Sequence, residues 1–220
     1  MENQSNLHYE TVTPLLRETL EDLMSVELFD SFALAGGTSL SLKYGHRISV
    51  DIDLFTNTPY GSLNFKTLEA YLDARFPYFE YPDHGNIVGF GRGYYIGESE
   101  NDFIKVDLYY HDEIANPYEI INGIRFVSTD DVVAMKVDVV SRKGRKKDFW
   151  DLHELLNYYS LEEMIELHRV RHEWNHERET ILENFTDFEL ADNMPDPVCL
   201  RKKEWGLIKK TFVEHIQKKK

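Results

Sequence analysis

The sequence has little cysteine and no long hydrophobic run. Cys199 is the only cysteine among 220 residues, which excludes an intrachain disulfide and favours a reducing, cytoplasmic setting. No apolar stretch approaches the roughly 20 residues that a membrane-spanning helix needs. We therefore expect a globular, cytoplasmic protein without a membrane partner.

Positive charge is also scarce. The chain has 25 lysines and arginines against 39 aspartates and glutamates, a formal net charge of −14 at pH 7. Proteins that coat nucleic acid over a whole face are basic, so this composition disfavours that class. A local basic site stays open. The acidic surplus suits carboxylates that hold metal, and it equally suits simple solubility.

Helical periodicity divides the chain into two parts. Residues 1–127 alternate helix and strand patterns, with several antiparallel strands expected over 78–127, and predict an α+β core. Residues 128–220 have helical spacing and almost no glycine, which predicts a helical lobe. Thr13 before Pro14 predicts the start of a helix over 12–30.

Two adjacent glycines in "FALAGGTSLSLKYGH" separate a predicted strand from a predicted short helix. Gly36 and Gly37 precede the hydroxyl residues Thr38 and Ser39. Backbone N–H groups at the start of a helix bind anions, and glycine lets them approach a phosphate closely. A tight turn without any ligand is the simpler interpretation.

Paired carboxylates follow in "VDIDLFT". Because alternate residues of a strand face one side, Asp51 and Asp53 should lie close together. Like charges at that distance favour a shared cation, and Mg²⁺ prefers oxygen ligands. Asp107 stands in the apolar strand "FIKVDLYY" and would complete a two-metal site if the strands are neighbours. The alternatives are a solvated strand face and an ion pair of Asp107 near Lys105.

The order of these motifs resembles nucleotidyltransferases of the DNA polymerase β type. More narrowly, "LAGGTSLSLKYGHRISVDIDLF" resembles the AbiEii/AbiGii toxin family, including its Gly-His-Arg at Gly45, His46 and Arg47. The later stretch "MKVDVVSRKGRKKDFWDLHELL" resembles that family's downstream motifs, a lysine followed by Asp-x-x-Asp. The resemblance covers most of residues 31–157.

The resemblance implies a nucleotidyltransferase fold, a mixed β-sheet flanked by helices, whose C-terminal helical lobe completes the nucleotide site. It implies Mg²⁺-dependent transfer of a nucleoside monophosphate from an NTP to an acceptor hydroxyl, for instance at a tRNA 3′ end. Family members are toxins of toxin–antitoxin or abortive-infection phage-defence pairs, so an antitoxin protein is an expected partner. A phosphotransferase or a non-catalytic nucleotide-binding module on the same fold are the alternatives.

The family's functional residues map onto matching positions of this chain. Its metal ligands correspond to Asp51, Asp53 and Asp107, for two Mg²⁺ ions with Mn²⁺ as an alternative. Lys136 would neutralise the triphosphate, and Asp148 would act within the nucleotide site. These five are the implied catalytic residues, and the implied nucleotide-binding residues add Gly36, Gly37, Thr38 and Ser39. Without the resemblance, Lys136 is a solvated helix residue and Asp148 an acidic residue near a helix N-terminus.

Two further stretches stand out in the C-terminal part. The basic run "RKGRKK" offers Arg142, Lys143 and Arg145 to the phosphates of an acceptor, although a solvated turn explains it equally well. "HEWNH", His172 to His176, matches the H-E-x-x-H pattern of zinc proteases. Dense neighbouring charges and His168 four residues earlier favour an exposed helix face instead, so the protease is a remote alternative.

Overall fold

The computed structural model describes residues 6–81, 90–111 and 114–217, and the chain divides into two compact units. The first, the sheet unit, contains Met1–Lys43 and Ser49–Val127. The second, the helical unit, contains Tyr44–Ile48 and Ser128–Lys220. No helix in the described ranges is both long enough and apolar enough to cross a bilayer.

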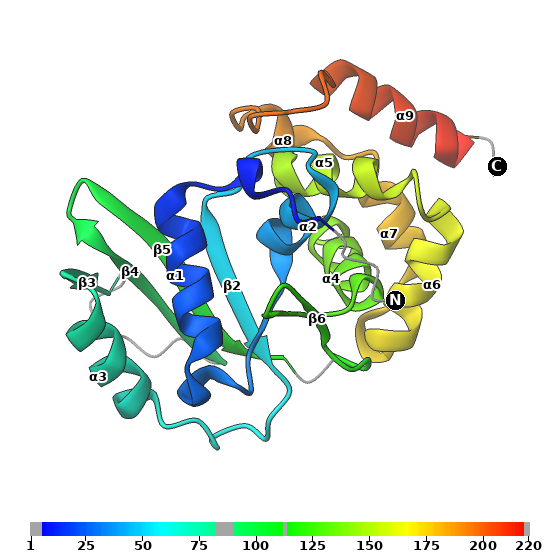
Figure 1. The fold of residues 1–220 in the computed structure, drawn as a ribbon. Coiled ribbons are helices and arrows are strands. Elements are labelled where there is room, and N and C mark those ends of the chain that lie inside the picture. Colours follow the sequence, from blue (N-terminus) through cyan, green and yellow to red (C-terminus); the bar gives the residue numbers. More distant parts are fainter. Residues whose placement is uncertain (1–5, 82–89, 112–113, 218–220) are drawn as a thin grey trace. The chain divides into compact units, whose positions relative to one another are not determined.

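The described residues of the sheet unit form a mixed seven-stranded sheet in the order β3-β4-β5-β2-β1-β7-β6 (Figure 1). Its strands are β1 Ala33–Leu34, β2 Asp51–Thr56, β3 Tyr78–Glu80, β4 Gly91–Ser99, β5 Asp102–Tyr110, β6 Glu119–Ile121 and β7 Ile124–Phe126. β2 pairs parallel with β5, β1 pairs parallel with β7, and the remaining neighbours are antiparallel. The mixed sheet with flanking helices confirms the predicted fold class. Residues 82–89 and 112–113 of the expected strand region lie outside the described residues.

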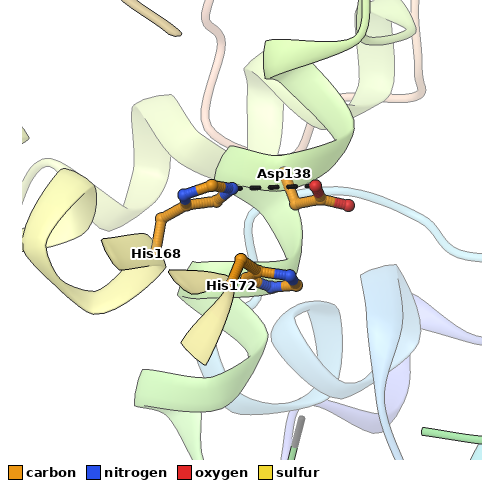
Figure 2. Close-up of side chains that lie close together, drawn as sticks. All are labelled: Asp138, His168 and His172. Atoms are coloured by element: carbon orange, nitrogen blue, oxygen red, sulfur yellow. Dashed lines mark ion pairs between the residues drawn. The ribbon is translucent and has the colours of Figure 1, made fainter. Parts of the chain in front are cut away.

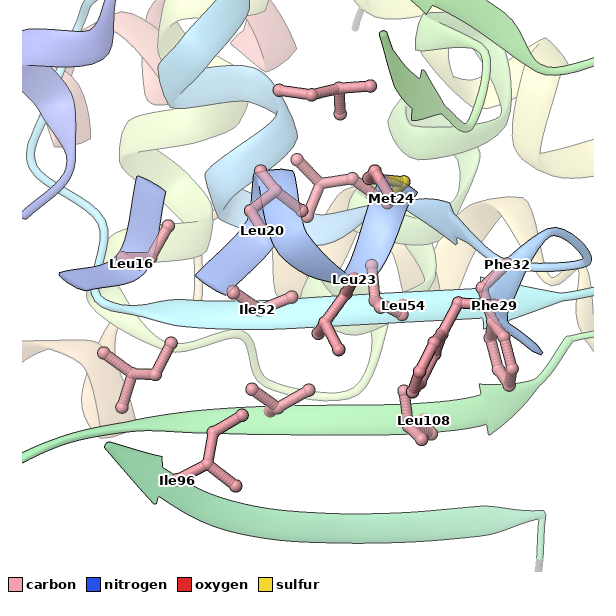
Figure 3. Close-up of a cluster of buried hydrophobic side chains, with 14 of the residues drawn as sticks. Leu16, Leu20, Leu23, Met24, Phe29, Phe32, Ile52, Leu54, Ile96 and Leu108 are labelled. Atoms are coloured by element: carbon pink, nitrogen blue, oxygen red, sulfur yellow. The ribbon is translucent and has the colours of Figure 1, made fainter. Parts of the chain in front are cut away.

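Helix α1, Pro14–Ser25, packs its apolar side against this sheet. Leu16, Leu20 and Leu23 recur at helical spacing and are fully or almost fully buried with the core residues of β2 (Figure 3). Burying each of these side chains contributes roughly 1.5–3 kcal/mol. The Thr13 hydroxyl caps the helix by accepting the N–H of Leu16, as predicted.

The helix predicted over residues 12–30 is shorter in the structure. Val26 adopts an extended backbone and ends α1, and a 3₁₀ turn, η2 Glu27–Phe29, follows. A second 3₁₀ turn, η1 Tyr9–Thr11, precedes α1. The sheet unit also contains α3 Phe65–Arg75 and most of α2 Gly36–Tyr44. The helical pattern of α1 therefore ends at Val26, a β-branched residue that prefers an extended backbone.

The helical unit consists of helices around an aromatic core. Its helices are α4 Thr129–Ser141, α5 Lys146–Leu155, α6 Leu161–Arg171, α7 Arg178–Asn184, α8 Glu189–Asp192 and α9 Trp205–Gln217, with a 3₁₀ turn η3 Glu173–Asn175. Ser128 caps α4, and Ser160 forms a capping box with Glu163 at the start of α6. Phe149 and Phe212 are fully buried in contact, and Trp150 stacks on Trp205. These contacts fix α5 against α9.

Candidate active site

Three aspartates lie on one face of two neighbouring strands. β2 and β5 run parallel with Asp53 opposite Asp107 and Asp51 opposite Lys105. Along β2 the side chains alternate between partly and fully buried, so Asp51 and Asp53 share the partly buried face while Ile52 and Leu54 enter the core. The structure thus brings together the three carboxylates that the sequence nominated.

Lys105 is the cation beside these carboxylates. Its Nζ lies 2.5 Å from Oδ2 of Asp107, so the ion pair considered from the sequence is present. Burial opposes the charge of Lys105, but the carboxylates of Asp107, Asp53 and Asp51 outweigh it and raise the pKa of the lysine. The charge of Lys105 thus interacts with all three carboxylates.

The second carboxylate oxygen of Asp107 is also relevant to metal binding. Its Oδ1 is buried and has no hydrogen-bond partner within the described residues. A buried carboxylate oxygen left this way is costly unless a cation or another ligand approaches it. The partly buried oxygens on this face therefore fit a hard divalent metal ion, which takes carboxylate ligands and shares its remaining positions with phosphate oxygens.

Gly36 makes room for Asp53 at the start of α2. A Cβ added at Gly36 would lie 2.1 Å from Oδ2 of Asp53, and Gly36 has a φ of +65°, in the left-handed region. Both constraints admit only glycine without displacement. The carboxylate of Asp53 and the N-terminus of α2 are therefore adjacent, and positive helix-dipole charge faces the acidic strand. This arrangement suits a metal ion and phosphate bound side by side.

The two hydroxyls after the glycines are buried and bonded within the protein. The Thr38 hydroxyl donates to the carbonyl of Asp51 and lies 2.8 Å from the hydroxyl of Ser49. The Ser39 hydroxyl donates to the carbonyl of Gly36 at 3.1 Å. These bonds tie α2 to the chain that enters β2, so Thr38 and Ser39 position the turn in this structure. Sequence reasoning did not single out Ser49, since a serine in a loop carries no distinct signal.

Lys136 and Asp148 belong to what we call the buried ion network: His46, Arg47, Lys136, Asp148 and Asp151, all in the helical unit. Lys136 Nζ lies 2.7 Å from Oδ1 of Asp148 and 2.7 Å from Oδ2 of Asp151. Arg47 donates to Asp151 through Nε at 2.7 Å and through Nη2 at 2.9 Å, and His46 Nε2 lies 2.7 Å from Oδ1 of Asp151. His46 and Arg47 thus both contact the carboxylate of Asp151.

Charges within this network compensate one another. Burial opposes ionisation of Asp151, yet Arg47 and Lys136 hold the pKa of its carboxyl well below the usual range. Burial likewise opposes the charge of Lys136, while Asp148 and Asp151 raise the pKa of this lysine above its usual value. Asp148 also accepts the backbone N–H of Arg145 at 3.1 Å, which caps α5. Lys136, Arg47, Asp148 and Asp151 thus pair with one another within the helical unit.

The exposed side chains of the basic run have carboxylate partners. Arg142 pairs with Asp138, Lys143 lies 3.2 Å from Asp187, and Arg145 lies 3.1 Å from Asp148. The pair of Lys143 with Asp187 is open to solvent, and such pairs contribute little to stability, so a phosphate can replace that carboxylate at little cost. Asp138 and Asp148 are buried, so the pairs of Arg142 and Arg145 are not of this low-cost kind.

The H-E-x-x-H pattern does not form one α-helix. α6 ends at Arg171, and Glu173–Asn175 form the 3₁₀ turn η3. Instead, His168 and His172 lie beside Asp138 of α4 (Figure 2). Asp138 was not singled out from the sequence, although a carboxylate inside the valine-rich stretch "VVAMKVDVV" is the signal that could have done so.

Known proteins resemble this chain in sequence and in fold. A family model described as nucleotidyl transferase AbiEii toxin, type IV TA system, matches residues 18–219. An uncharacterised protein of Aquifex aeolicus is 29% identical over 144 residues, which make up 64% of this chain. The match spans 65% of the length of that relative.

Solved structures share the fold. MenT4, a nucleotidyltransferase toxin from Mycobacterium tuberculosis, has a TM-score of 0.56 at 14% identity, over 92% of this chain and 83% of that chain. JHP933 from Helicobacter pylori has a TM-score of 0.50 at 17% identity, over 93% of this chain and 91% of that chain. At these identities the likeness establishes the fold, and the family model establishes the family. The chain therefore belongs to the AbiEii family of nucleotidyltransferase toxins of type IV toxin–antitoxin systems.

Proposed function

We propose that the protein transfers a nucleoside monophosphate from an NTP to an acceptor hydroxyl, with Asp51, Asp53 and Asp107 as the ligands of the divalent metal, Mg²⁺. The single observation that supports this assignment is the register of β2 and β5, which sets Asp53 opposite Asp107 with Asp51 on the same face. The grouping of three carboxylates near Lys105, together with the buried Oδ1 of Asp107 that has no hydrogen-bond partner within the described residues, gives the reason for a cation there. Nucleotidyltransferases usually use a divalent metal ion.

The protein's own groups then have separate tasks. Asp51, Asp53 and the spare Oδ1 of Asp107 hold the cation, and the N–H groups at Gly36 and Gly37 bind phosphate oxygens. The metal, when bound, supplies stabilisation of the charge that develops on the attacking and leaving oxygens. Gly36 keeps the carboxylate of Asp53 in place, and Thr38 and Ser39 hold the turn through their buried hydrogen bonds.

The assignment of Lys136 and Asp148 to the nucleotide stays a prediction. Each would have to exchange an ion pair of 2.7 Å for contact with a ligand. Breaking a buried pair in this way costs about 3–5 kcal/mol unless the ligand replaces the lost charge. A triphosphate could replace it at Lys136, whereas Asp148 would need a donor such as a nucleobase or ribose hydroxyl. Their pairing favours a role in fixing the fold of the helical unit.

We further propose RNA as the acceptor, with a tRNA 3′ end as the specific case, and an antitoxin protein as the partner. The acceptor hypothesis rests on the exposed Arg142, Lys143 and Arg145 in an otherwise acidic chain. The antitoxin follows from the type IV toxin–antitoxin family. Acceptor binding through these residues should weaken as salt rises, because each phosphate contact releases counterions.

The test uses the full chain, Mg²⁺, total RNA and NTPs labelled at either the α or the γ phosphate. Label from the α phosphate should appear on RNA with the wild-type protein. Asp53→Asn and Asp107→Asn should each reduce it by more than about 100-fold, since even an outer-shell change at a metal site costs 10–100-fold. Asp102→Asn, an exposed aspartate at the other end of β5, is the matched control and should keep the wild-type rate.

Each other outcome has a distinct meaning. Label from the γ phosphate alone on RNA would identify a phosphotransferase on the same fold. No transfer from any NTP, together with tight NTP binding, would identify a nucleotide-binding module. Transfer at the wild-type rate by Asp53→Asn or Asp107→Asn would show that the strand carboxylates are not the metal ligands.

A further inference from the structure

Two histidines and an aspartate of the helical unit converge on one point. His168 lies in the last turn of α6, and His172, four residues later, is the residue at which that helix ends. Asp138 comes from α4 and faces His168 directly (Figure 2). One ligand atom from each of the three residues can be chosen so that all lie within 4.8 Å of one another. Residues four apart on a helix share one face, and this spacing explains why His168 and His172 lie next to each other.

The cluster is buried. His168 has no exposed surface, and His172 and Asp138 are 3% and 8% exposed. Within the described residues, Nε2 of His168 has no hydrogen-bond partner, and Oδ1 of Asp138 stands 3.6 Å from it, beyond hydrogen-bond distance. A buried imidazole nitrogen left in this way is unfavourable, and a cation between the two atoms would satisfy both.

Outer contacts orient both of these groups. Nδ1 of His168 lies 2.9 Å from Nδ1 of His176, and Oδ2 of Asp138 pairs with Arg142. These contacts occupy the far side of each group and leave Nε2 of His168 and Oδ1 of Asp138 facing one another. Metal-binding histidines and carboxylates characteristically have such a second contact, which fixes the ring tautomer and the carboxylate orientation.

We propose that Asp138, His168 and His172 bind a divalent transition-metal ion, Zn²⁺, which joins α4 to α6. Imidazole nitrogen with one carboxylate suits Zn²⁺, whereas Mg²⁺ takes oxygen ligands. Tetrahedral bonds of about 2.1 Å set ligand atoms about 3.4 Å apart. The separation of 3.6 Å between Oδ1 of Asp138 and Nε2 of His168 is close to this value, and no pair of ligand atoms needs to approach by more than about 1.4 Å.

This site differs from the strand carboxylates and from a zinc protease. Its ligands all belong to the helical unit, whereas Asp51, Asp53 and Asp107 belong to the sheet unit. Glu173, which would be the protease base, is exposed in the turn η3 and is not among the grouped residues. The buried position and the link between two helices predict a structural metal that stabilises the fold.

The experiment strips the full-length protein with chelator, reloads it with Zn²⁺, and measures bound zinc and Tm. We expect one zinc per chain and a rise in Tm of about 5–10 °C at a hundred times the Kd. Asp138→Asn and His172→Gln should lose both. Two variants should keep both: His153→Gln, a histidine of α5 outside the cluster, and Asp53→Asn, which removes a strand carboxylate.

Cobalt makes the test independent of stability. Co²⁺ added to the stripped protein should give the visible absorption of a tetrahedral site, which Zn²⁺ displaces and a tenfold excess of Mg²⁺ does not. If Asp138→Asn fails to fold, His172→Gln and the cobalt spectrum of the wild type still decide the matter. Less than about a tenth of a zinc per chain, or zinc that survives both cluster variants, would overturn the proposal and leave a plain histidine–aspartate ion pair.

Discussion

The carboxylates of the sheet unit and those of the helical unit have opposite surroundings. Asp51, Asp53 and Asp107 share one face of two strands with Lys105 as a neighbouring cation. Asp148 and Asp151 are fully buried and meet Lys136, Arg47 and Arg145. The first group gathers three carboxylates near Lys105, whereas each carboxylate of the second contacts two cationic side chains.

This difference separates two reasons for placing aspartates in a protein interior. An excess of carboxylates is unfavourable without a ligand, so the protein accepts a stability cost where a cation will bind. A matched network needs no ligand and rigidifies the fold, although its net contribution to stability can be small while the loss of one partner is severe. Removing one charge from each group should therefore change the free energy of unfolding differently in the two groups.

Asp151→Asn should give the largest effect on stability. The amide leaves Arg47 and Lys136 without their shared counter-charge, and breaking such a buried pair costs about 3–5 kcal/mol. Asp53→Asn should have the opposite sign or none, because it relieves repulsion among the strand carboxylates. Urea unfolding of both variants measures the comparison directly.

Glu166→Gln is the control for that measurement. Glu166 and Arg169 are both exposed and lie 2.6 Å apart in the same helical unit, so loss of this pair should lower the free energy of unfolding far less than Asp151→Asn does. If Asp151→Asn cost no more than Glu166→Gln, the network would not be the structural element that its distances indicate. Lys136 and Asp148 would then gain support as ligand-binding residues.

Gly36→Ala should have the next largest effect. The new Cβ would lie 2.1 Å from Oδ2 of Asp53 at a φ of +65°, and we expect a cost of about 2–3 kcal/mol together with loss of nucleotide transfer. Gly61→Ala is a matched control, because Gly61 has a φ of +84° and nothing within 4 Å of its added Cβ. It should cost roughly 1–2 kcal/mol and leave transfer unchanged. Equal effects of the two substitutions would contradict a specific contact between Gly36 and Asp53.

His153→Gln tests a smaller electrostatic feature of the helical unit. Burial and the nearby charge of Lys203, whose Nζ lies 3.0 Å from Nδ1, lower the pKa of His153 to about 4. Since the unfolded state titrates near pH 6.5, it binds more protons than the folded state between these values, and stability falls as pH drops from about 6.5 to 4.

The variant should flatten this part of the Tm profile. Partial exposure of the ring weakens the effect, so we expect a change in the slope corresponding to less than about 2 °C between pH 6.5 and 4.5. An unchanged profile for His153→Gln would show that the neutral ring is not required for its contacts with Lys203.

Local pattern predicted a large part of the fold. The alternation in "VDIDLFT" correctly places Asp51 and Asp53 on one face, and the cap at Thr13 is confirmed. The pairing of β5 with β2 could not be predicted from local pattern. Nothing local to Asp107 shows that β5 pairs with β2, and the resemblance to a family supplied that step before the structure did.

Long-range pairing explains what the sequence did not reveal. Asp151 meets His46 and Arg47 across 105 and 104 residues, a separation for which no local pattern exists. The histidine row beginning at His168 was interpreted as an exposed face, because the charged neighbours are visible in the sequence and the burying helix α4 is not. Buried polar groups of this kind are specified by tertiary contacts, and their chemistry is evident only once the partners are placed.

The short segment Tyr44–Ile48 has a consequence for how the chain folds during synthesis. This segment belongs to the helical unit although 79 residues of the sheet unit, Ser49–Val127, follow it. During synthesis Arg47 leaves the ribosome long before Asp151. The ion pair between the two can therefore form only after the residues of the sheet unit that lie between them have been synthesised. Closing so long a loop is slow, and a fragment starting at Ser128 would lack Arg47 altogether. The helical unit is therefore completed last, and it cannot be cut out as a contiguous piece that keeps its ion network.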